Sequence, residues 1–391
     1  MKKYLLFAVC SLLFASAANA EFTTKARSAF LVDFQSGAAI VAENANNMMP
    51  PSSMLKLMTL AVAFEEIKAG RLSMDDKITI SENADYRNPI FEDASKLCLA
   101  AGQQITVHDA VLGLIVQSAG DAGIALSEKI AGSEDAMTKK MTALARKIGM
   151  EKSTFGNVSG LPDPNNLMTS RELAMLANYL IVRHADIYPM FATKKFEFNG
   201  SQSEWCAKWM QTKTLSYNKL LFIMPEADGL KTGSTLAGGY GMVASAVRNG
   251  RRLIAVLNGF NCKDHNVLAA EMKRLLMYGF NETFNKVFYK PGDAIIEIPV
   301  WYGRQPTAVA TVAKPFVATL DKKQNAKIQI IARFDEPLAA PVRAGEKIGE
   351  LIAQTDEKVL ARAPLVAKDH VGKVQLFARV VKNLQVIFTG K

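Results

Sequence analysis

The sequence predicts an α+β protein in which an antiparallel sheet packs against helices and a small all-β domain follows. Two short apolar runs flank Gln35-Ser36-Gly37, a pattern typical of an antiparallel hairpin. Two further apolar runs flank Asn249-Gly250, and this dipeptide is a strong signal for a two-residue hairpin turn. After residue 284 the chain consists of short β-rich runs separated by glycines and prolines.

The first twenty residues have the pattern of an export signal. Two lysines precede an apolar run over residues 5–14, which is too short to span a bilayer. The small-residue tripeptide Ala18-Asn19-Ala20 then fits a cleavage site. We therefore expect residues 1–20 to be a signal peptide and the mature chain to begin at Glu21.

A helix is expected directly after Pro51, with Ser52 or Ser53 available as its N-terminal cap. Apolar residues at helical spacing predict further helices over 108–131, 134–148 and 170–182. The helices are followed by the second hairpin and one more helix, so we expect the first domain to span 21–284. The β-rich runs predict a second domain over 285–365.

The C-terminal segment has the pattern of a basic amphipathic helix. From about Gly372 to Lys391, apolar residues recur at three- and four-residue spacing with basic residues between them. Such a basic amphipathic helix can lie in an anionic membrane surface or dock on its own domain. We assign residues 366–391 to this helix.

Composition excludes several classes of protein. The formal charge is +10, but the basic residues are dispersed and lack interleaved aromatics, which argues against nucleic-acid binding. An anionic membrane or cell-wall polymer is the expected partner of that charge. Three cysteines remain in the mature chain, so at most one pair can close. Cys262 and His265 form a half-site with no second ligand pair nearby, and we predict neither a metal nor another cofactor.

Ser53-Met54-Leu55-Lys56 places a hydroxyl and an amine three residues apart on a helix, where they share a face. The lysine can then take the serine proton. This role requires its pKa to be lowered from about 10.4 by roughly 3 units, or about 4 kcal/mol, which burial beside another cation would supply. By itself the pattern is common, and most examples are a helix cap with a solvated lysine.

Lys231-Thr232-Gly233 is expected on a strand that lines a cleft. The lysine offers a cation and the threonine a hydroxyl to a substrate carboxylate, while the glycine allows a ligand to approach the backbone closely. A phosphate-loop interpretation fails, because the lysine precedes the glycines of this segment.

A third motif, Ser118-Ala119-Gly120, lies between these two on a predicted helical segment. A serine-lysine motif, a serine triplet and a lysine-threonine-glycine motif in this order form the combination known in penicillin-binding proteins and class A β-lactamases. The three motifs in order are far more specific than any one of them.

The chain resembles the low-molecular-mass D-Ala-D-Ala carboxypeptidases, the serine peptidase family that includes penicillin-binding protein 5. The likeness covers essentially the whole chain and includes segments 51–59, 160–162, 228–234 and 237–240. It implies a β-lactamase/transpeptidase-like first domain and a β-sandwich second domain. It also favours a membrane anchor for the C-terminal helix, and hence an exported protein held at the periplasmic face of the inner membrane.

The resemblance further implies which residues act on a peptidoglycan stem peptide ending in D-Ala-D-Ala. Ser53 would be the nucleophile, Lys56 its general base, and Ser118 would relay the proton to the leaving D-alanine. β-Lactam antibiotics would acylate the same serine as covalent inhibitors. The implied substrate-binding residues are Lys231, Thr232, Gly233, Ser234 and Gly120.

Two of these implied roles concern the reacting carbonyl and the terminal carboxylate. Lys231 and Thr232 would hold the carboxylate, and the backbone N–H groups of Ser53 and Ser234 would form the oxyanion hole. The family's serine triplet normally ends in asparagine, whose amide helps hold the catalytic lysine and the substrate carbonyl. Gly120 departs from that pattern, which puts efficiency or substrate choice in question, whereas the Ser118 hydroxyl is retained.

Two alternatives follow from the same motifs. A serine β-lactamase would need an added base for fast deacylation. Glu172 follows the Gly160-Leu161 loop, but it lies within a helical pattern where a structural salt bridge is expected. A non-catalytic cell-wall binding protein is supported only by Gly120. A Ser-His-Asp hydrolase is disfavoured, because the four histidines have no recognisable setting and no nucleophile elbow is present.

Overall fold

The computed structural model describes residues 2–10, 22–200, 203–262, 264–322 and 327–375. Its contacts divide the chain into two compact units, one of residues 21–280 and the other of residues 1–20 together with 281–391. The boundary predicted at 284 stays a prediction from the sequence. Among the described residues, no helix combines the length and the apolar character needed to cross a bilayer.

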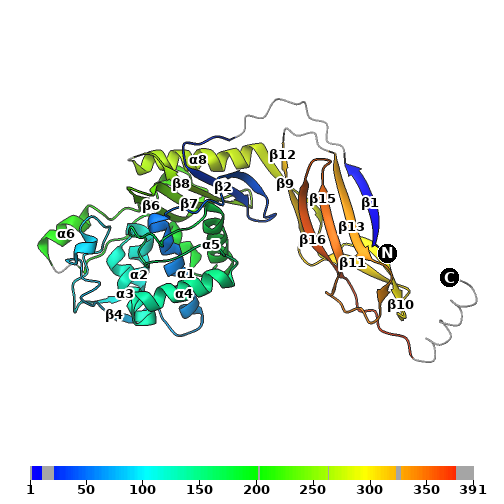
Figure 1. The fold of residues 1–391 in the computed structure, drawn as a ribbon, viewed down its shortest axis with the longest axis horizontal. Helices are drawn as coiled ribbons and strands as arrows, with labels where there is room; N and C mark the ends of the chain where they lie inside the picture. Colours follow the sequence, from blue (N-terminus) through cyan, green and yellow to red (C-terminus); the bar gives the residue numbers. More distant parts are fainter. Residues whose placement is uncertain (1, 11–21, 201–202, 263, 323–326, 376–391) are drawn as a thin grey trace, which may run out of the picture. The chain divides into compact units, whose positions relative to one another are not determined.

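The first unit is built on a five-stranded antiparallel sheet in the order β3-β2-β8-β7-β6 (Figure 1). Its strands are β2 (Ser28–Asp33), β3 (Ala39–Glu43), β6 (Ala227–Thr235), β7 (Gly239–Arg248) and β8 (Arg251–Phe260). Both predicted hairpins are present. Asn249 and Gly250 have φ values of 51° and 76°, the left-handed conformation that a two-residue turn of this kind requires.

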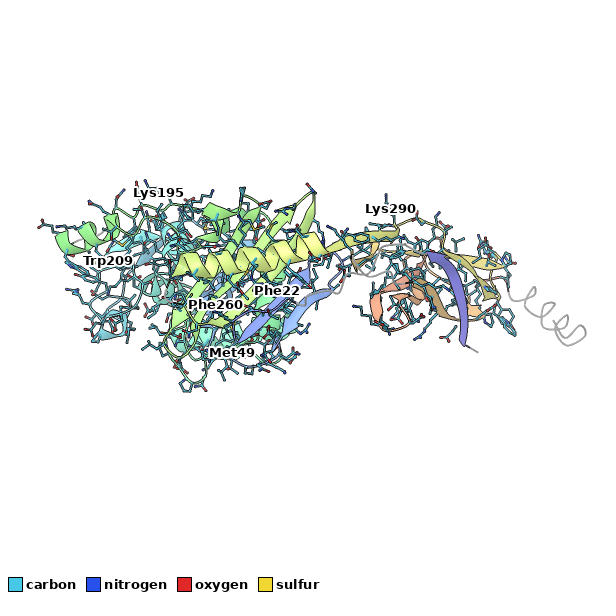
Figure 2. All side chains as sticks on the ribbon, turned by 90° about the horizontal axis from the view of Figure 1, so that it is seen from above. Phe22, Met49, Lys195, Trp209, Phe260 and Lys290 are labelled. Carbon is cyan, nitrogen blue, oxygen red and sulfur yellow. A yellow bond between two sulfur atoms is a disulfide. The ribbon has the colours of Figure 1, made fainter. Side chains whose placement is uncertain are left out.

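Strand alternation divides the core of the first unit between the two faces of the sheet. Ala29 and Leu31 belong to the cluster shared with helix α8 (His265–Glu282), whereas Phe30 belongs to the cluster on the helical side. Figures 1 and 2 show α8 lying along the sheet. The opposite face is covered by the helical layer that carries the serine motifs.

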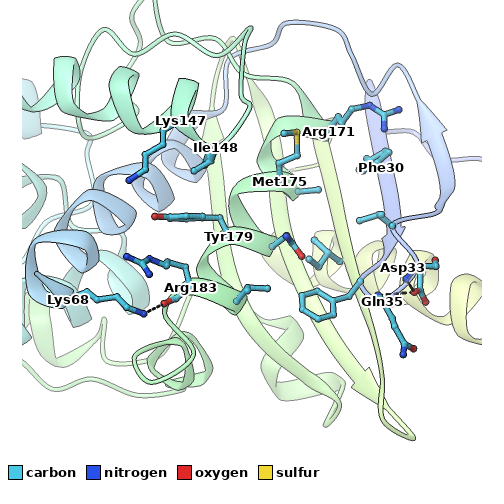
Figure 3. Close-up of a pocket in the computed structure, with 18 residues that line it drawn as sticks. Phe30, Asp33, Gln35, Lys68, Lys147, Ile148, Arg171, Met175, Tyr179 and Arg183 are labelled. Atoms are coloured by element: carbon cyan, nitrogen blue, oxygen red, sulfur yellow. Dashed lines mark hydrogen bonds between the residues drawn. The ribbon is translucent and has the colours of Figure 1, made fainter. Parts of the chain in front are cut away.

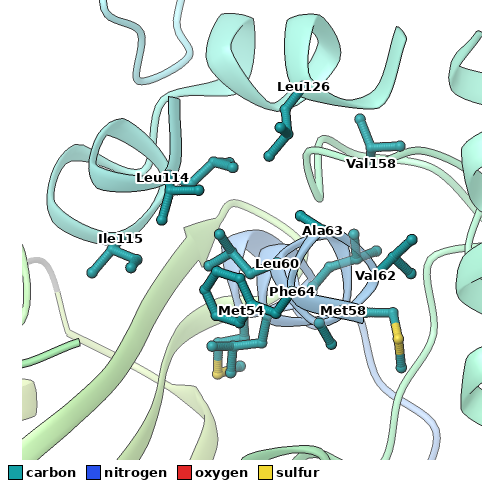
Figure 4. Close-up of a cluster of buried hydrophobic side chains, with 14 of the residues drawn as sticks. Met54, Met58, Leu60, Val62, Ala63, Phe64, Leu114, Ile115, Leu126 and Val158 are labelled. Atoms are coloured by element: carbon teal, nitrogen blue, oxygen red, sulfur yellow. The ribbon is translucent and has the colours of Figure 1, made fainter. Parts of the chain in front are cut away.

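Helix α1 (Lys56–Lys68) lies at the centre of that layer and continues the short 3-10 helix η1 (Ser52–Leu55). Its residues from Lys56 to Phe64 are all buried, which explains why its sequence is apolar around most of the helix. Figure 4 shows side chains from other segments, among them Leu114 and Leu126, along one side of it. The other helical and strand elements of this layer are β4 (Lys77–Thr79), η2 (Pro89–Phe91), β5 (Gln104–Thr106), α2 (Val107–Leu112), η3 (Gly113–Gln117), α3 (Gly120–Ala131), α4 (Glu134–Lys147), α5 (Ser170–Arg183), η4 (Tyr188–Ala192) and α6 (Glu204–Gln211). The short helix α7 (Leu220–Ile223) lies on the other side of the sheet, where Leu220 belongs to the α8 cluster.

Two local predictions in this layer are wrong. The helix predicted over 108–131 is interrupted, because η3 ends at Gln117 and Ser118 adopts a left-handed φ of 59°. Neither predicted serine caps the first helix: Pro51 is the N-cap residue and makes no side-chain cap bond. The Ser52 hydroxyl instead lies 2.9 Å from the Thr235 hydroxyl of β6.

The second unit is a two-layer β structure, with a seven-stranded sheet in the order β1-β13-β15-β16-β11-β10-β14 and a two-stranded sheet of β12 and β9. Its core includes Phe316 from the small sheet and Ile330 and Leu351 from the large one. The strands are β1 (Lys2–Cys10), β9 (Thr283–Tyr289), β10 (Ile296–Trp301), β11 (Thr307–Val312), β12 (Phe316–Asp321), β13 (Ile328–Asp335), β14 (Leu338–Ala339), β15 (Lys347–Gln354) and β16 (Val359–Ala367).

The two ends of the chain bear on the predicted signal peptide and anchor. Residues 2–10, within the predicted signal peptide, form β1, which pairs antiparallel with β13. At the other end, β16 continues to Ala367, and Val371 and Lys373 form isolated bridges. The amphipathic helix assigned to 366–391 therefore does not begin at 366, and residues 376–391 lie outside the described residues.

Candidate active site

Ser53 and Lys56 meet at the junction of η1 and α1. The Lys56 Nζ donates a hydrogen bond to the Ser53 Oγ at 3.0 Å and another to the Ser159 carbonyl oxygen. Lys56 is 3% exposed, whereas Ser53 is half-buried. The spacing therefore brings hydroxyl and amine together, with the serine on the more accessible side.

Burial lowers the pKa of Lys56 from its ordinary value to about 7, and the negative charge of Asp121 partly opposes this effect. A substantial fraction of the amine is therefore neutral near pH 7 and able to accept a proton from Ser53. This is the environment that the serine-lysine motif requires. Burial, one of the two effects expected from the sequence, is its main cause.

Lys231 lies on β6 and is 1% exposed. Its Nζ donates to the Thr232 carbonyl oxygen at 3.0 Å. Burial lowers the pKa of Lys231 well below its ordinary range, and the charge on Lys56 lowers it further. A carboxylate arriving at this amine would favour the ammonium form again, because opposite charges stabilise each other in a site shielded from water.

Gly233 allows β6 to pass directly over the start of the nucleophile helix. A Cβ atom at this position would lie 2.9 Å from the Ser53 nitrogen and 3.0 Å from the Met54 nitrogen. The glycine is therefore needed for strand–helix packing as well as for ligand approach. The next residue, Ser234, is exposed. Ser234 directly follows Gly233, which packs against the Ser53 nitrogen. The two predicted oxyanion donors, the N–H groups of Ser53 and Ser234, therefore belong to two segments that pack together.

Ser118 lies at the turn between η3 and α3. Its side chain is 5% exposed, and its Oγ makes no hydrogen bond with any residue in the described part of the chain. Buried hydroxyls almost always have a partner, so this one is suited to a group that the substrate brings.

Asp121 is an additional residue of this site that no sequence motif identifies. Its carboxylate is fully buried and accepts hydrogen bonds from the backbone N–H groups of Leu97, Leu99 and Ala122. Burial raises the pKa of Asp121 to about 6, against the opposing effect of these amides. The available signal was a lone acid in the otherwise apolar first turn of a helix.

Comparison with known proteins identifies the family. A family model described as D-alanyl-D-alanine carboxypeptidase matches residues 15–261, and one described as the penicillin-binding protein 5 C-terminal domain matches residues 285–373.

The chain belongs to the D-alanyl-D-alanine carboxypeptidase family.

Individual relatives agree with this assignment. The D-alanyl-D-alanine carboxypeptidase DacC of Escherichia coli strain K12 is 31% identical over 360 residues, covering 91% of this chain and 86% of DacC. Penicillin-binding protein 5 from Haemophilus influenzae has a similar structure, with a TM-score of 0.81 at 30% identity, covering 91% of this chain and 100% of that one. Penicillin-binding protein D2 from Listeria monocytogenes, in its ampicillin-bound form, gives a TM-score of 0.56 at 25% identity, covering 67% of this chain and 100% of that one.

These matches confirm the predicted fold class, a transpeptidase-like domain followed by a β-sandwich domain, and the predicted enzyme class of serine-type carboxypeptidase. The roles assigned to individual residues remain predictions.

In this carboxypeptidase, the position of the family's asparagine is closely surrounded. The Gly120 N–H donates to the Ser95 carbonyl oxygen at 2.7 Å. A Cβ atom on Gly120 would lie 3.2 Å from the Cε1 atom of Phe91, whose side chain is fully buried. A side chain at this position would therefore require the Phe91 ring to shift.

Glu172 has a structural role in the carboxypeptidase, but its partners are different from the cation that was expected. Its carboxylate accepts hydrogen bonds from the N–H groups of Lys152 and Ser153, each at 2.8 Å, and from the Ser153 hydroxyl at 2.5 Å. These bonds hold the 150–153 segment onto the start of α5. The side chain is therefore committed to the fold and is not placed as a deacylation base.

A separate hollow of about 1050 Å³ lies beside β2 and α5, and none of the motif residues lines it (Figure 3). Arg183 and the Tyr179 hydroxyl both donate to Glu65, at 2.9 and 2.7 Å. Burial and the Glu65 carboxylate raise the pKa of Tyr179 to about 12. Tyr179 is therefore not activated as a nucleophile, and Lys68 and other basic side chains border the hollow.

Proposed function

We propose that this carboxypeptidase removes the terminal D-alanine from peptidoglycan pentapeptides through an acyl-enzyme on Ser53. The observation that carries the proposal is the 3.0 Å contact between the Ser53 hydroxyl and the buried amine of Lys56, whose pKa is about 7. A serine with such a partner is activated for nucleophilic attack near neutral pH.

In the acylation step, Lys56 accepts the Ser53 proton as the serine oxygen attacks the carbonyl of the penultimate D-alanine. The N–H groups of Ser53 and Ser234 stabilise the oxyanion, and each such donor contributes about 2.7–4 kcal/mol in comparable sites. The C–N bond then breaks, and Ser118 passes a proton to the leaving amine. Lys231 holds the carboxylate of the departing residue.

In the deacylation step, water attacks the ester carbonyl, and Lys56 acts as the base that accepts one of its protons. The ester C–O bond breaks, Ser53 regains its proton, and the shortened peptide leaves with a new carboxylate. The products are free D-alanine and a stem peptide one residue shorter.

β-Lactams are proposed as covalent inhibitors of the same serine, in line with the ampicillin-bound form of the Listeria monocytogenes protein. Opening of the lactam ring forms an ester with Ser53, but the leaving nitrogen stays tethered to the acyl group. The tethered group hinders the approach of water, so the adduct is expected to persist for many minutes. Turnover within seconds would instead identify a β-lactamase.

The test is product analysis together with covalent labelling. The full chain should release free D-alanine from a pentapeptide and should be labelled by a fluorescent penicillin. Ser53→Ala should abolish both, whereas Ser133→Ala, which removes the N-cap hydroxyl of α4, should retain both. Labelling that survives in Ser53→Ala would refute the assigned nucleophile, and absence of both activities in the wild type would favour a non-catalytic binding protein.

We further propose that the chain is exported and held peripherally at the periplasmic face of the inner membrane. The signal pattern of residues 1–20 and the basic amphipathic pattern from Gly372 to Lys391 support this localisation. The mature N-terminus is expected at Glu21, by sequencing of the exported protein. The full chain should bind anionic vesicles more strongly than neutral ones, and a chain ending at Val371 should lose that difference. Equal vesicle binding by both chains would contradict the anchor.

A further inference from the structure

The Asp121 carboxylate joins the serine triplet to a separate loop, residues 91–99. Its two oxygens accept from the Leu97 N–H at 2.9 Å and from the Leu99 N–H at 3.1 Å. On its own helix it accepts from the Ala122 N–H at 2.8 Å. The side chain is 0% exposed, so these bonds take the place of water.

A disulfide fixes the part of the loop that supplies these amides. Cys98 lies between Leu97 and Leu99 and is bonded to Cys206 on α6, and both sulfur-bearing residues are buried. Cys98 also has a left-handed φ of 61°, a conformation that non-glycine residues rarely adopt unless their surroundings hold them there. The covalent link is one such restraint.

The same loop reaches the triplet at a second point. The Ser95 carbonyl oxygen accepts from the Gly120 N–H at 2.7 Å, and the Phe91 ring borders Gly120. Lys96, which is also buried, donates to the Phe91 and Glu92 carbonyl oxygens within the loop. The loop is therefore bonded internally and to both residues that follow the Ser118-Ala119 turn.

We propose that Asp121 is a positioning residue for acylation, and that the Cys98–Cys206 disulfide maintains the 91–99 loop in the conformation that fixes its carboxylate. The proposal rests on the proposed function, because it concerns the same cleft. In this proposal the disulfide keeps Ser118 in position and holds the Asp121 carboxylate near Lys56. This role is distinct from a contribution to general stability. The pairing of these cysteines was left open by the sequence.

The charges that face this carboxylate determine what an experiment would detect. Lys96 on the loop and Lys56 on α1 interact electrostatically with it, and Lys231 on β6 interacts in the same way with Lys56. Asp121→Asn removes a charge that favours the Lys56 ammonium, so the pKa of Lys56 falls. Loss of the amide bonds acts in the same direction, because it raises the pKa of Asp121 and leaves it neutral over a wider pH range.

The experiment measures the second-order acylation rate constant for a fluorescent penicillin from about pH 5.5 to about 9. It uses the full chain, either unaltered or carrying Cys206→Ser, Asp121→Asn, or both. Cys206→Ser should lower the maximal rate by about 5- to 30-fold, the effect of one or two lost hydrogen bonds. In both single variants the acid limb of the profile should move to lower pH. Cys262→Ser, at the free cysteine, is the matched control and should leave the profile unchanged.

Three outcomes bear on the proposal. An unaltered rate and profile in Cys206→Ser would overturn it, and so would a uniform loss of rate with no shift of the acid limb. In the Asp121→Asn background, Cys206→Ser should change the rate by less than about two-fold, because both changes act on the same contact. A rate loss in the double variant equal to the product of the two single losses would also overturn it.

If Asp121→Asn fails to fold, the pH profile of Cys206→Ser decides alone, and if Cys206→Ser fails to fold, the pH profile of Asp121→Asn decides. Absence of acylation in the unaltered chain would instead refute the proposed function.

Discussion

Two buried lysines, Lys56 and Lys231, set the protonation state of the cleft. Both have lowered pKa values, because burial disfavours the ammonium form, and the repulsion between them adds to the effect on Lys231. The two lysines are therefore suited to different roles. The lysine next to Ser53 is available as a base, while the other gains its charge most readily when a carboxylate is present.

The first prediction concerns the pH dependence of acylation. The base must be neutral, and the pKa of Lys56 is about 7, so the acylation rate constant is expected to fall as the pH drops through about 7. Stopped-flow labelling with a fluorescent penicillin measures this directly. Lys68→Gln, in the last turn of the same helix, should leave the profile unchanged. A flat profile between about pH 6 and 8 would contradict the assignment of Lys56 as base.

A second prediction concerns Gly120. Gly120→Asn is expected to raise the rate of acylation by a D-Ala-D-Ala peptide, by up to about 5-fold for one added hydrogen bond. Phe91 restricts the gain, since its ring lies 3.2 Å from the added Cβ. The double variant Phe91→Leu/Gly120→Asn should therefore be faster than Gly120→Asn alone, with Phe91→Leu as the control. An unchanged or lower rate in both Gly120→Asn variants would remove the argument about this position.

At this scale, the sequence identified residues whose chemistry depends on spacing along one element. Ser53 and Lys56 were predicted to meet, because three residues on a helix fix the distance between them. Asp121 was not predicted, because two of its partners are backbone amides about two dozen residues away. Any residue type except proline can supply a backbone amide, so the sequence gives no sign of these bonds. The Cys98–Cys206 bond escaped prediction for the same reason: its sequence separation of 108 carries no signal.

Among the elements, the contact between β6 and η1 is the one on which the cleft depends. Two glycines permit close approach to η1, one on β6 and one on a separate turn. Gly233 brings β6 next to the Ser53 nitrogen, and Gly160, with a φ of 71°, lies so close to η1 that an added Cβ would be 2.1 Å from the Ser52 carbonyl oxygen. The nucleophile is therefore held between a strand and a turn that both lack side chains at the point of approach.

The third prediction follows from this contact. Gly233→Ala is expected to separate β6 from η1 and to reduce acylation by at least about 10-fold, while costing about 1–3 kcal/mol of stability through overpacking. The rate constant and the thermal midpoint should be measured on the same preparations. Gly250→Ala, in the β7–β8 turn, is a control for a glycine replaced without nearby atoms. It should lose stability and retain the rate, and equal rates in all three proteins would contradict the role given to Gly233.

The hairpins and most helices could be predicted, because turn dipeptides and apolar spacing are local signals. The break of the 108–131 helix at Ser118 could not. Apolar residues continue at helical spacing across the break and no proline marks it, so the pattern favours one helix. The Ser118 turn is held by local bonds to the Gly113 carbonyl oxygen and by a tertiary bond from Gly120 to Ser95, and the apolar pattern records neither.

For the whole molecule, the main feature is that each unit has its own hydrophobic core. The clusters around α1 and α8 belong to the first unit, and the cluster that includes Phe316 and Leu351 belongs to the second. From the sequence, the change from long helical patterns to short β runs predicts a domain boundary near 284, and this boundary stays a prediction.

The fourth prediction is made at the same scale. Calorimetry should show two unfolding transitions, because a domain with its own core unfolds cooperatively by itself. Acylation of Ser53 by a penicillin should raise the midpoint of one transition and leave the other unchanged, since the ligand binds only one unit. Ser53→Ala with the same penicillin provides the control. A single transition, or an equal shift of both, would contradict independent units.

The bond between Cys98 and Cys206 encloses Ser118 within a covalent ring and leaves Ser53 and Lys231 outside it, on opposite sides. A protease that cuts a peptide bond anywhere between the two cysteines would therefore leave the polypeptide in one connected piece. Such a nicked protein would run as one band on a gel until thiol is added, and only then would the fragment bearing the nucleophile separate from the one bearing the carboxylate-binding strand.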